Sequence, residues 1–204
     1  MEIAQKRWDS IAKPLHSLGK LETLLIQIAG ITGNAEVDLS RRGLIAMCAD
    51  NGVVEEGVTQ TGQEVTAIVA ENFLKYDTSV GVMCKQNHAE IFPVDMGMVT
   101  DTKVRTDHKI AYGTQNMTKG PAMTREQAVK GLEAGIDMVR ELNDKGYRIL
   151  AIGEMGIGNT TTSSAVASVL LKQPVEEMTG RGAGLTSEGL MRKINAIKKS
   201  HCIK

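Results

Sequence analysis

The sequence predicts an α/β protein in which a parallel sheet is flanked by helices in Rossmann-like layers, with a small helical subdomain at its N-terminus. Two observations carry this prediction. Short apolar runs without polar alternation, typical of strands buried on both faces, alternate with stretches of helical periodicity. Three of these runs end in an acidic residue near glycine. We therefore expect a helical segment over residues 1–35 and an α/β domain over residues 36–204.

The first half of the chain predicts two helices, a strand, a third helix and a second strand. Apolar residues recur at roughly helical spacing through residues 3–30. Pro14 divides this stretch, because proline cannot continue a helix. Residues 44–49 form a short apolar run that stops at a turn signal. The next apolar spacing predicts a helix over 63–73, and residues 90–95 form the second strand.

The second half of the chain predicts helix, strand, loop and two further helices. Thr124 and Gln127 form a capping box that opens a long helix. Residues 148–152 form the third strand, and a glycine-containing loop follows it. A helix rich in Thr, Ser, Ala and Val then continues to about Leu171, and apolar spacing predicts a last helix over 190–197.

Composition and charge exclude several classes of function. The 204 residues include 24 Lys and Arg against 24 Asp and Glu, and only one Trp, three Tyr and two Phe. This balance excludes a broad electrostatic footprint for nucleic acid or an anionic membrane, and it argues against base-stacking platforms. Three cysteines without a CxxC pair and four scattered histidines predict no disulfide framework, no metal site and no cofactor. The N-terminus has no apolar signal region, so we expect a soluble cytoplasmic protein.

The acidic residues at the three strand ends are Asp50, Asp95 and Glu154. In open parallel sheets a ligand binds outside the carboxyl ends of the strands. Any one of these acids can instead serve only as a cap for the following helix. Three acids at equivalent strand ends favour a site at this edge of the sheet.

The segment from Gly153 to Thr162 carries the strongest chemical signal. A strand, a loop with three glycines and a helix opening on threonines present backbone N–H groups and a positive dipole end, which together suit phosphate. Asn159 stands where a Walker A loop needs lysine, which disfavours a nucleoside triphosphatase, and Thr161 stands where the dinucleotide fingerprint needs its third glycine. A single phosphate is the predicted ligand, and a merely tight turn is the alternative. The candidate binding residues here are Gly156, Gly158, Asn159, Thr160 and Thr161.

Two further segments supply candidate binding residues. The glycine cluster at residues 180–184 precedes a helix with basic residues, and Arg181 or Lys193 could supply the cation that the first loop lacks. A flexible linker with solvated charges is the alternative reading. A weaker candidate is a set of polar residues, between the first predicted strand and the helix after it, whose side chains could orient the ring of a ligand. The residues concerned are Arg181, Gly182, Gly184 and Lys193 in the first segment, and Asp50, Asn51 and Gln63 in the second.

Taken in order, five segments resemble the nicotinate-nucleotide–dimethylbenzimidazole phosphoribosyltransferase family. The resemblance covers residues from about 7 to 199, and the string Glu-Met-Gly-Ile-Gly-Asn-Thr-Thr is highly specific. The segments that carry it are Lys13–Glu22, Ala49–Val53, Gly62–Thr66, Gly153–Thr161 and Gly180–Leu185.

The resemblance implies an activity and an assembly. The activity is transfer of phosphoribose from nicotinate mononucleotide to 5,6-dimethylbenzimidazole, giving nicotinate and α-ribazole 5′-phosphate for the lower ligand of cobalamin. The implied assembly is a homodimer with a parallel α/β domain and a small helical domain. Both glycine segments would hold the phosphoribosyl group, with Lys193 near them and Gln63 near the benzimidazole.

Two features of the chain depart from the family pattern. Asn51 stands where many members have histidine in an Asp-His-Gly motif. The family's catalytic glutamate belongs to a glycine-rich motif in the C-terminal third of chains of roughly 350 residues, and residues 1–204 contain no such motif. The expectation is a truncation or a shifted reading frame near residue 200, with Glu154 left in an accessory catalytic role. The alternative function is a catalytically impaired fragment that only binds a nucleotide monophosphate or a partner.

Overall fold

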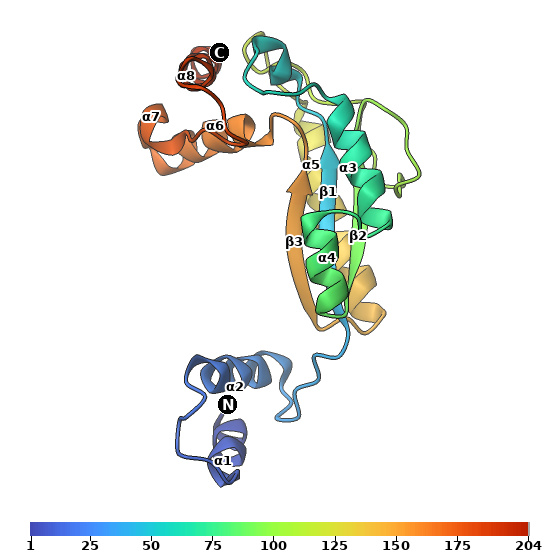
Figure 1. The fold of residues 1–204 in the computed structure, drawn as a ribbon, viewed down its shortest axis with the longest axis vertical. Coiled ribbons are helices and arrows are strands. Elements are labelled where there is room, and N and C mark those ends of the chain that lie inside the picture. Colours follow the sequence, from blue (N-terminus) through green and yellow to red (C-terminus); the bar gives the residue numbers. More distant parts are fainter. Residues whose placement is uncertain (204) are drawn as a thin grey trace. The chain divides into compact units, whose positions relative to one another are not determined.

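The computed structural model describes residues 1–203. The chain divides into two compact units, Met1–Arg41 and Arg42–Lys204. The first unit is helical and the second contains the sheet, as Figure 1 shows.

The first unit is a pair of helices, α1 (Glu2–Ser10) and α2 (Lys20–Thr32). Ala4, Ile26 and Ala29 form its small core, against which Trp8 packs. The prediction of two helices on either side of Pro14 is confirmed. The connection between the helices is tied down by a buried ion pair in which Lys13 Nζ lies 2.9 Å from Glu22 Oε1.

The sheet of the second unit is fully parallel, as predicted, with strand order β2-β1-β3. Its strands are β1 (Arg42–Ala49), β2 (Ala89–Gly97) and β3 (Ile149–Met155). The third strand runs three residues beyond the predicted end, so it includes Glu154. In the register of the sheet, Cys48 of β1 pairs with Asp95 of β2 on one side and with Met155 of β3 on the other. The strand ends therefore meet at one edge of the sheet.

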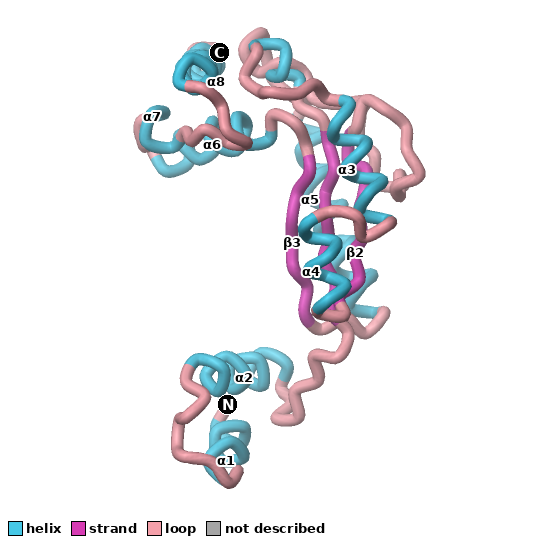
Figure 2. The backbone as a smooth tube through the Cα atoms, in the orientation of Figure 1, coloured by secondary structure: helices cyan, strands magenta, loops and turns pink. Residues whose placement is uncertain are grey.

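Helices cover both faces of β1 and β2, whose successive side chains point to opposite faces of the sheet. Figure 2 shows α3 (Glu64–Leu74) and α4 (Ser79–Gln86) in front of the sheet and α5 (Arg125–Asp144) behind it. The predicted capping box at the start of α5 is confirmed. Helix α4 was not predicted from periodicity, and it begins where the Thr78 hydroxyl accepts a hydrogen bond from the Gly81 N–H. The front core contains Ala46, Cys48, Ala70, Phe73, Cys84 and Ile91, and the rear core contains Ile45, Val94, Met138, Leu142 and Tyr147.

Three more helices follow β3 and pack on one another. They are α6 (Asn159–Leu171), the short α7 (Val175–Met178) and α8 (Ser187–His201). The 3-10 helix η1 (Gly52–Glu56) after β1 packs against α8. The residues of these contacts are Ala165, Val175, Ile194 and Ile197 between the helices, and Val53, Val58 and Ala196 under η1.

The segment between β2 and α5, residues 98–124, crosses the carboxyl ends of the strands; we call it the strap. Its backbone is fixed by the hydrogen bond from Thr114 N–H to the Asp50 carbonyl oxygen. Its main side-chain anchor is Lys109, whose Nζ lies 3.1 Å from Asp95 Oδ2 and 3.1 Å from Asp101 Oδ1. Asp95 is completely buried, so this ion pair neutralises a charge inside the protein.

Apolar side chains are exposed along the edge strand and on two helices. Strand β3 has one neighbour in the sheet, and its Ile152 is 84% exposed. Helices α5 and α6 also expose apolar residues, among them Leu132 and Leu170. This exposure is unusual, because parallel strands are normally covered on both faces.

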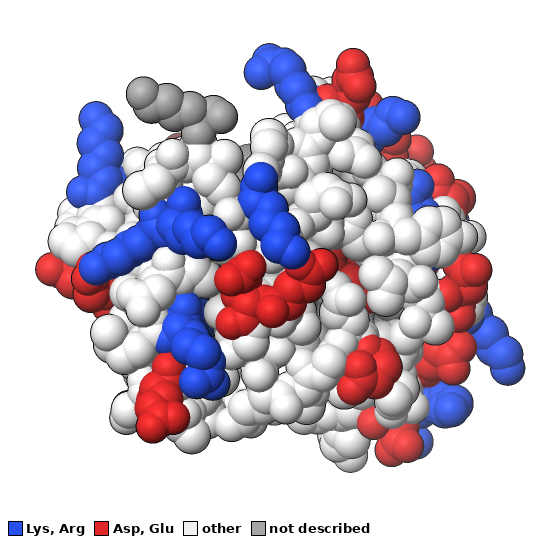
Figure 3. All heavy atoms as spheres, turned by 90° about the horizontal axis from the view of Figure 1, so that it is seen from above, with Lys and Arg blue, Asp and Glu red and all other residues white. Residues whose placement is uncertain are grey.

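Charged residues do not form a face of one sign in the view of Figure 3, where basic and acidic side chains are interspersed. Among residues 1–203, no helix is both long enough and apolar enough to cross a bilayer.

Replacing Lys109 by methionine should destabilise the second unit. Loss of one partner leaves the buried Asp95 carboxylate uncompensated, which costs about 3 kcal/mol in the free energy of unfolding. Urea denaturation checks this value. The exposed pair of Lys119 and Glu55 provides the control, since Lys119→Met should change stability little. If adding Asp95→Asn fails to recover part of the loss, the ion pair is not the anchor of the strap.

The Ile152→Lys variant should self-associate less than the wild-type chain. An unpaired edge with apolar side chains is a template for pairing with another chain, and an edge lysine opposes that pairing. The free energy of unfolding should stay within about 0.5 kcal/mol, because the side chain is exposed. Light scattering measures the association, and Met83→Lys on α4 is the matched control. Equal scattering by both variants would contradict a role for the β3 edge.

Candidate functional site

A cavity of about 290 Å³ lies at the carboxyl ends of the strands. Three segments far apart in the sequence form its wall: residues 58–61 after η1, residues 155–160 from the end of β3 to the start of α6, and residues 181–183 with Leu185 before α8. The two glycine segments singled out in the sequence are therefore brought together. The position agrees with the general rule for ligands in open α/β sheets.

The glycine loop, residues 156–158, joins β3 to α6 and depends on both of its glycines. A Cβ atom on Gly156 would collide with the carbonyl oxygen of Ala49. Gly158 has φ +90°, and a Cβ there would lie 3.0 Å from a Val54 methyl carbon. A side chain is therefore excluded at Gly156 by space and is strained at Gly158 by backbone conformation. This turn aims the N-terminus of α6 at the cavity.

The first turn of α6 is partly capped by its own residues. The Thr160 N–H donates to Asn159 Oδ1 at 2.7 Å, and the Thr161 N–H donates to the Gly158 carbonyl oxygen at 2.9 Å. The Thr161 side chain is completely buried. An anion that binds here can replace the local Asn159 oxygen on the Thr160 amide, with the positive end of the helix dipole in support.

Lys193 of α8 places a positive charge beside this helix end. Its side chain is 1% exposed, and its Nζ donates to Thr160 Oγ1 at 2.7 Å and to the Gly180 carbonyl oxygen at 3.0 Å. Burial lowers the pKa of Lys193, and within residues 1–203 no carboxylate pairs with it. A buried ammonium group with only neutral partners is costly, and an anion in the cavity would offset that cost.

The second glycine cluster is packed against α6. Gly182 has φ +57°, and a Cβ there would lie 2.8 Å from Thr160 Oγ1. The Arg181 guanidinium donates to the Leu185 carbonyl oxygen at 2.8 Å and to Ser187 Oγ at 3.1 Å. Arg181 and Gly182 line the cavity, so the alternative of a flexible linker does not describe this segment.

Three of the predicted binding residues lie behind the glycine loop. Asn51 donates its side-chain N–H to the Ile157 carbonyl oxygen at 3.0 Å, and Gln63 donates to the Asn51 carbonyl oxygen at 3.1 Å. Asp50 is completely buried, and burial raises its pKa. None of the three lines the cavity, so their contact with a substrate stays a prediction.

The remaining predicted residues are divided between the cavity wall and its surroundings. Gly156, Gly158, Asn159 and Thr160 line the cavity. The Gly184 carbonyl oxygen accepts a hydrogen bond from Gln60 at 2.6 Å just outside it. Glu154 is exposed on β3 and is outside the cavity wall. Its catalytic role also stays a prediction.

One part of the wall was not recognised in the sequence. Thr59, Gln60 and Thr61 contribute polar groups opposite the glycine loop. A short polar run between Gly57 and Gly62 was the available signal, but it resembles an ordinary surface turn.

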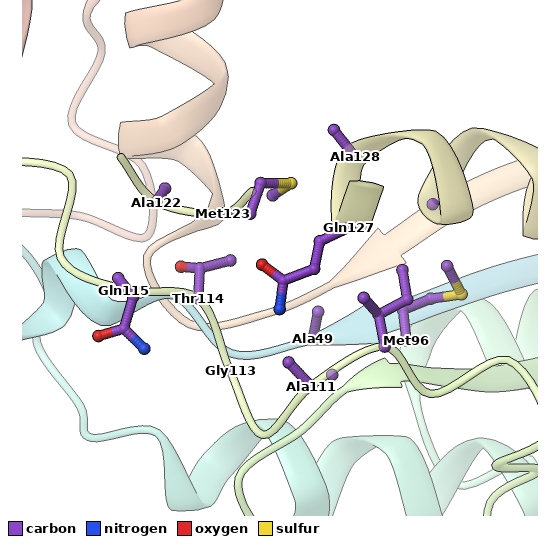
Figure 4. A pocket seen from close by; sticks show the side chains of 13 residues that line it. Ala49, Met96, Ala111, Gly113, Thr114, Gln115, Ala122, Met123, Gln127 and Ala128 are labelled. Atoms are coloured by element: carbon purple, nitrogen blue, oxygen red, sulfur yellow. The ribbon is translucent and has the colours of Figure 1, made fainter. Parts of the chain in front are cut away.

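A second cavity, of about 250 Å³, lies beside the N-terminal half of α5. Figure 4 shows the Gln127 side chain near its centre, between Met123 and Met96. Its wall is mainly apolar and contains no charged side chain, so this second cavity offers no counter-charge for a phosphate.

Comparisons with known proteins identify the family of the chain. A family model described as phosphoribosyltransferase matches residues 1–204. The nicotinate-nucleotide–dimethylbenzimidazole phosphoribosyltransferase of Ruminiclostridium cellulolyticum is 50% identical over 202 residues, which are 98% of this chain and 57% of that protein. The protein of the same name from Acetivibrio thermocellus is 48% identical over 202 residues, 98% of this chain and 58% of that protein.

A solved structure shows the same fold. The crystal structure of CobT from Thermus thermophilus superposes with a TM-score of 0.87 at 37% identity, covering 96% of this chain and 60% of that one. The chain thus spans a little over half of the length of the curated relatives it matches. The family model that matches residues 1–204, the relatives of about 50% identity and the shared fold show that the chain belongs to the nicotinate-nucleotide–dimethylbenzimidazole phosphoribosyltransferase family.

Proposed function

We propose that the chain binds the phosphoribosyl group of nicotinate mononucleotide for transfer to 5,6-dimethylbenzimidazole. The observation that carries the proposal is the buried Lys193 ammonium group beside the N-terminus of α6. A buried lysine, one helix end and a glycine loop suit one phosphate. The names of the relatives supply the two substrates.

The proposed reaction exchanges one bond at the anomeric carbon of ribose. The bond to the nicotinate nitrogen breaks, and nicotinate leaves with the electron pair. A benzimidazole nitrogen forms the new bond, and the proton on its opposite ring nitrogen passes to a carboxylate. The product is α-ribazole 5′-phosphate. The anomeric carbon becomes positively charged during this exchange, and nearby carboxylates stabilise that charge.

Glu154 is the proposed accessory carboxylate of this chain. It is exposed near the end of β3, two residues before the glycine loop. The proposal is that a ribose held by its phosphate at the glycine loop extends to this carboxylate. The base that accepts the benzimidazole proton belongs, by the family resemblance, to a C-terminal motif outside residues 1–204. The resemblance also supports a cytoplasmic homodimer as the setting of the reaction.

A second candidate function is binding of a nucleotide monophosphate or a partner without turnover. The position of Glu154 outside the cavity wall favours it, because the cavity then holds phosphate-binding groups but no carboxylate among its lining residues. The exposed apolar side chains of β3, α5 and α6 are equally compatible with a partner.

Replacing Gly158 by valine should weaken binding of nicotinate mononucleotide by more than about tenfold. Valine strongly disfavours the left-handed backbone conformation at this position, and its side chain would press on Val54 and Asn51. Isothermal titration calorimetry measures the affinity. Gly135→Ala, in open space on α5, is the matched control. Unchanged affinity in the folded Gly158→Val protein would remove the glycine loop from the site.

The 204-residue chain should form α-ribazole 5′-phosphate at a severely reduced rate. Loss of a general base typically costs about 10²–10⁴-fold. The assay compares the chain, its Glu154→Gln variant and the Ruminiclostridium cellulolyticum relative under the same conditions, with Glu133→Gln on α5 as the control. Turnover equal to that of the relative would contradict the assignment of the general base to a motif outside residues 1–204. Turnover that disappears in Glu154→Gln would make Glu154 itself the base.

A further inference from the structure

We propose that Asn51 and Thr66 are positioning residues that hold the two peptide groups flanking the Ile157 Cα atom and so fix the glycine loop before a ligand binds. The proposal rests on the proposed function and adds two residues that act through the loop. We call this pair of contacts the Ile157 clamp.

The first half of the clamp holds the N–H of Ile157. Thr66, in the first turn of α3, is completely buried, and its Oγ1 accepts a hydrogen bond from the Ile157 N–H at 3.0 Å. The Thr66 hydroxyl also lowers the pKa of the Asp50 carboxyl, against the stronger effect of burial, which raises it. Asp50 Oδ1 has no hydrogen-bond partner among residues 1–203. Thr66 therefore joins the glycine loop to the first turn of α3.

The second half of the clamp holds the carbonyl group of Ile157. The Asn51 side chain donates to the Ile157 oxygen at 3.0 Å, and its own oxygen accepts from the Thr162 hydroxyl at 3.2 Å. A carboxamide suits this position because it offers a donor and an acceptor from one planar group. Asn51 therefore joins the loop to the first turns of α6.

The loop needs such a clamp because of its composition. Ile157 lies between Gly156 and Gly158, and glycine has more backbone freedom than any other residue. One hydrogen bond on each of the two peptide groups that flank Ile157 opposes the rotations that would otherwise turn the loop amides away from the cavity. Ordering the loop before binding lowers the entropy that binding must overcome. The clamp thus contributes to ligand affinity although neither Asn51 nor Thr66 lines the cavity.

Three variants test the clamp. Thr66→Val keeps the shape of the side chain but removes the acceptor, Thr66→Ser keeps the hydroxyl, and Asn51→Asp puts a carboxylate oxygen against the Ile157 carbonyl. Two quantities are measured: hydrogen exchange of the Ile157 amide in the ligand-free chain by NMR, and the affinity for nicotinate mononucleotide by calorimetry. Exchange at Met138 in α5 reports any general loss of stability.

The clamp predicts a local effect. In Thr66→Val, Ile157 exchange should accelerate and affinity should fall, each by roughly tenfold, the usual size for one buried hydrogen bond. Met138 exchange should change much less, and Thr66→Ser should restore both quantities. Asn51→Asp should weaken binding to a similar degree.

Several results would overturn the proposal. They are unchanged Ile157 exchange in Thr66→Val, faster exchange with unchanged affinity, and equal acceleration at Ile157 and Met138. Failure of the proposed function is a separate result, because the wild-type chain would then not bind nicotinate mononucleotide. Ile157 exchange is measured without ligand, so it would still confirm or reject the clamp in that case.

Discussion

The close approach of Gly156 to the carbonyl oxygen of Ala49 is the constraint on which the site depends. At this point the chain leaving β3 passes over the end of β1 with no space for a side chain. The turn at Gly158 then starts α6, and Gly182 packs against Thr160 of that helix. A side chain at Gly156 would push the glycine loop away from β1 and Thr66. The cavity, the N-terminus of α6 and the Ile157 clamp therefore all depend on the close approach of Gly156 to Ala49.

The buried charge of Lys193 is the electrostatic basis of the proposed preference for a phosphate. Removing an ammonium group from water costs free energy, and a hydroxyl and a carbonyl oxygen offset it only in part. A phosphate would provide the missing negative charge. Asn159 offers no second cation at the place where triphosphate-binding loops carry lysine, so the electrostatics suit a monophosphate ester.

The second unit combines a well-packed core with uncovered apolar groups. Both faces of β1 and β2 are packed, whereas β3 is largely exposed and α5 and α6 present large apolar side chains to solvent. The phosphate-binding groups come from the ends of the sheet and from α8, and these parts are tied to the strap and η1. The proposed binding function thus relies on the packed part of the second unit. Efficient turnover is proposed to require a general base outside residues 1–204.

The sequence by itself determined the three strands and most of the helices in their order, together with the capping box at Thr124 and the glycine loop before α6. These features depend on short-range periodicity and on backbone conformations that few residues allow. It did not determine which strand-end acid faces solvent: Asp50 and Asp95 are buried, whereas Glu154 is exposed. That outcome depends on the strap and on the edge position of β3. Only the tertiary structure decided that Thr66 meets Ile157 across 91 residues and that Lys193 is buried beside Thr160, because such contacts depend on how distant elements pack together.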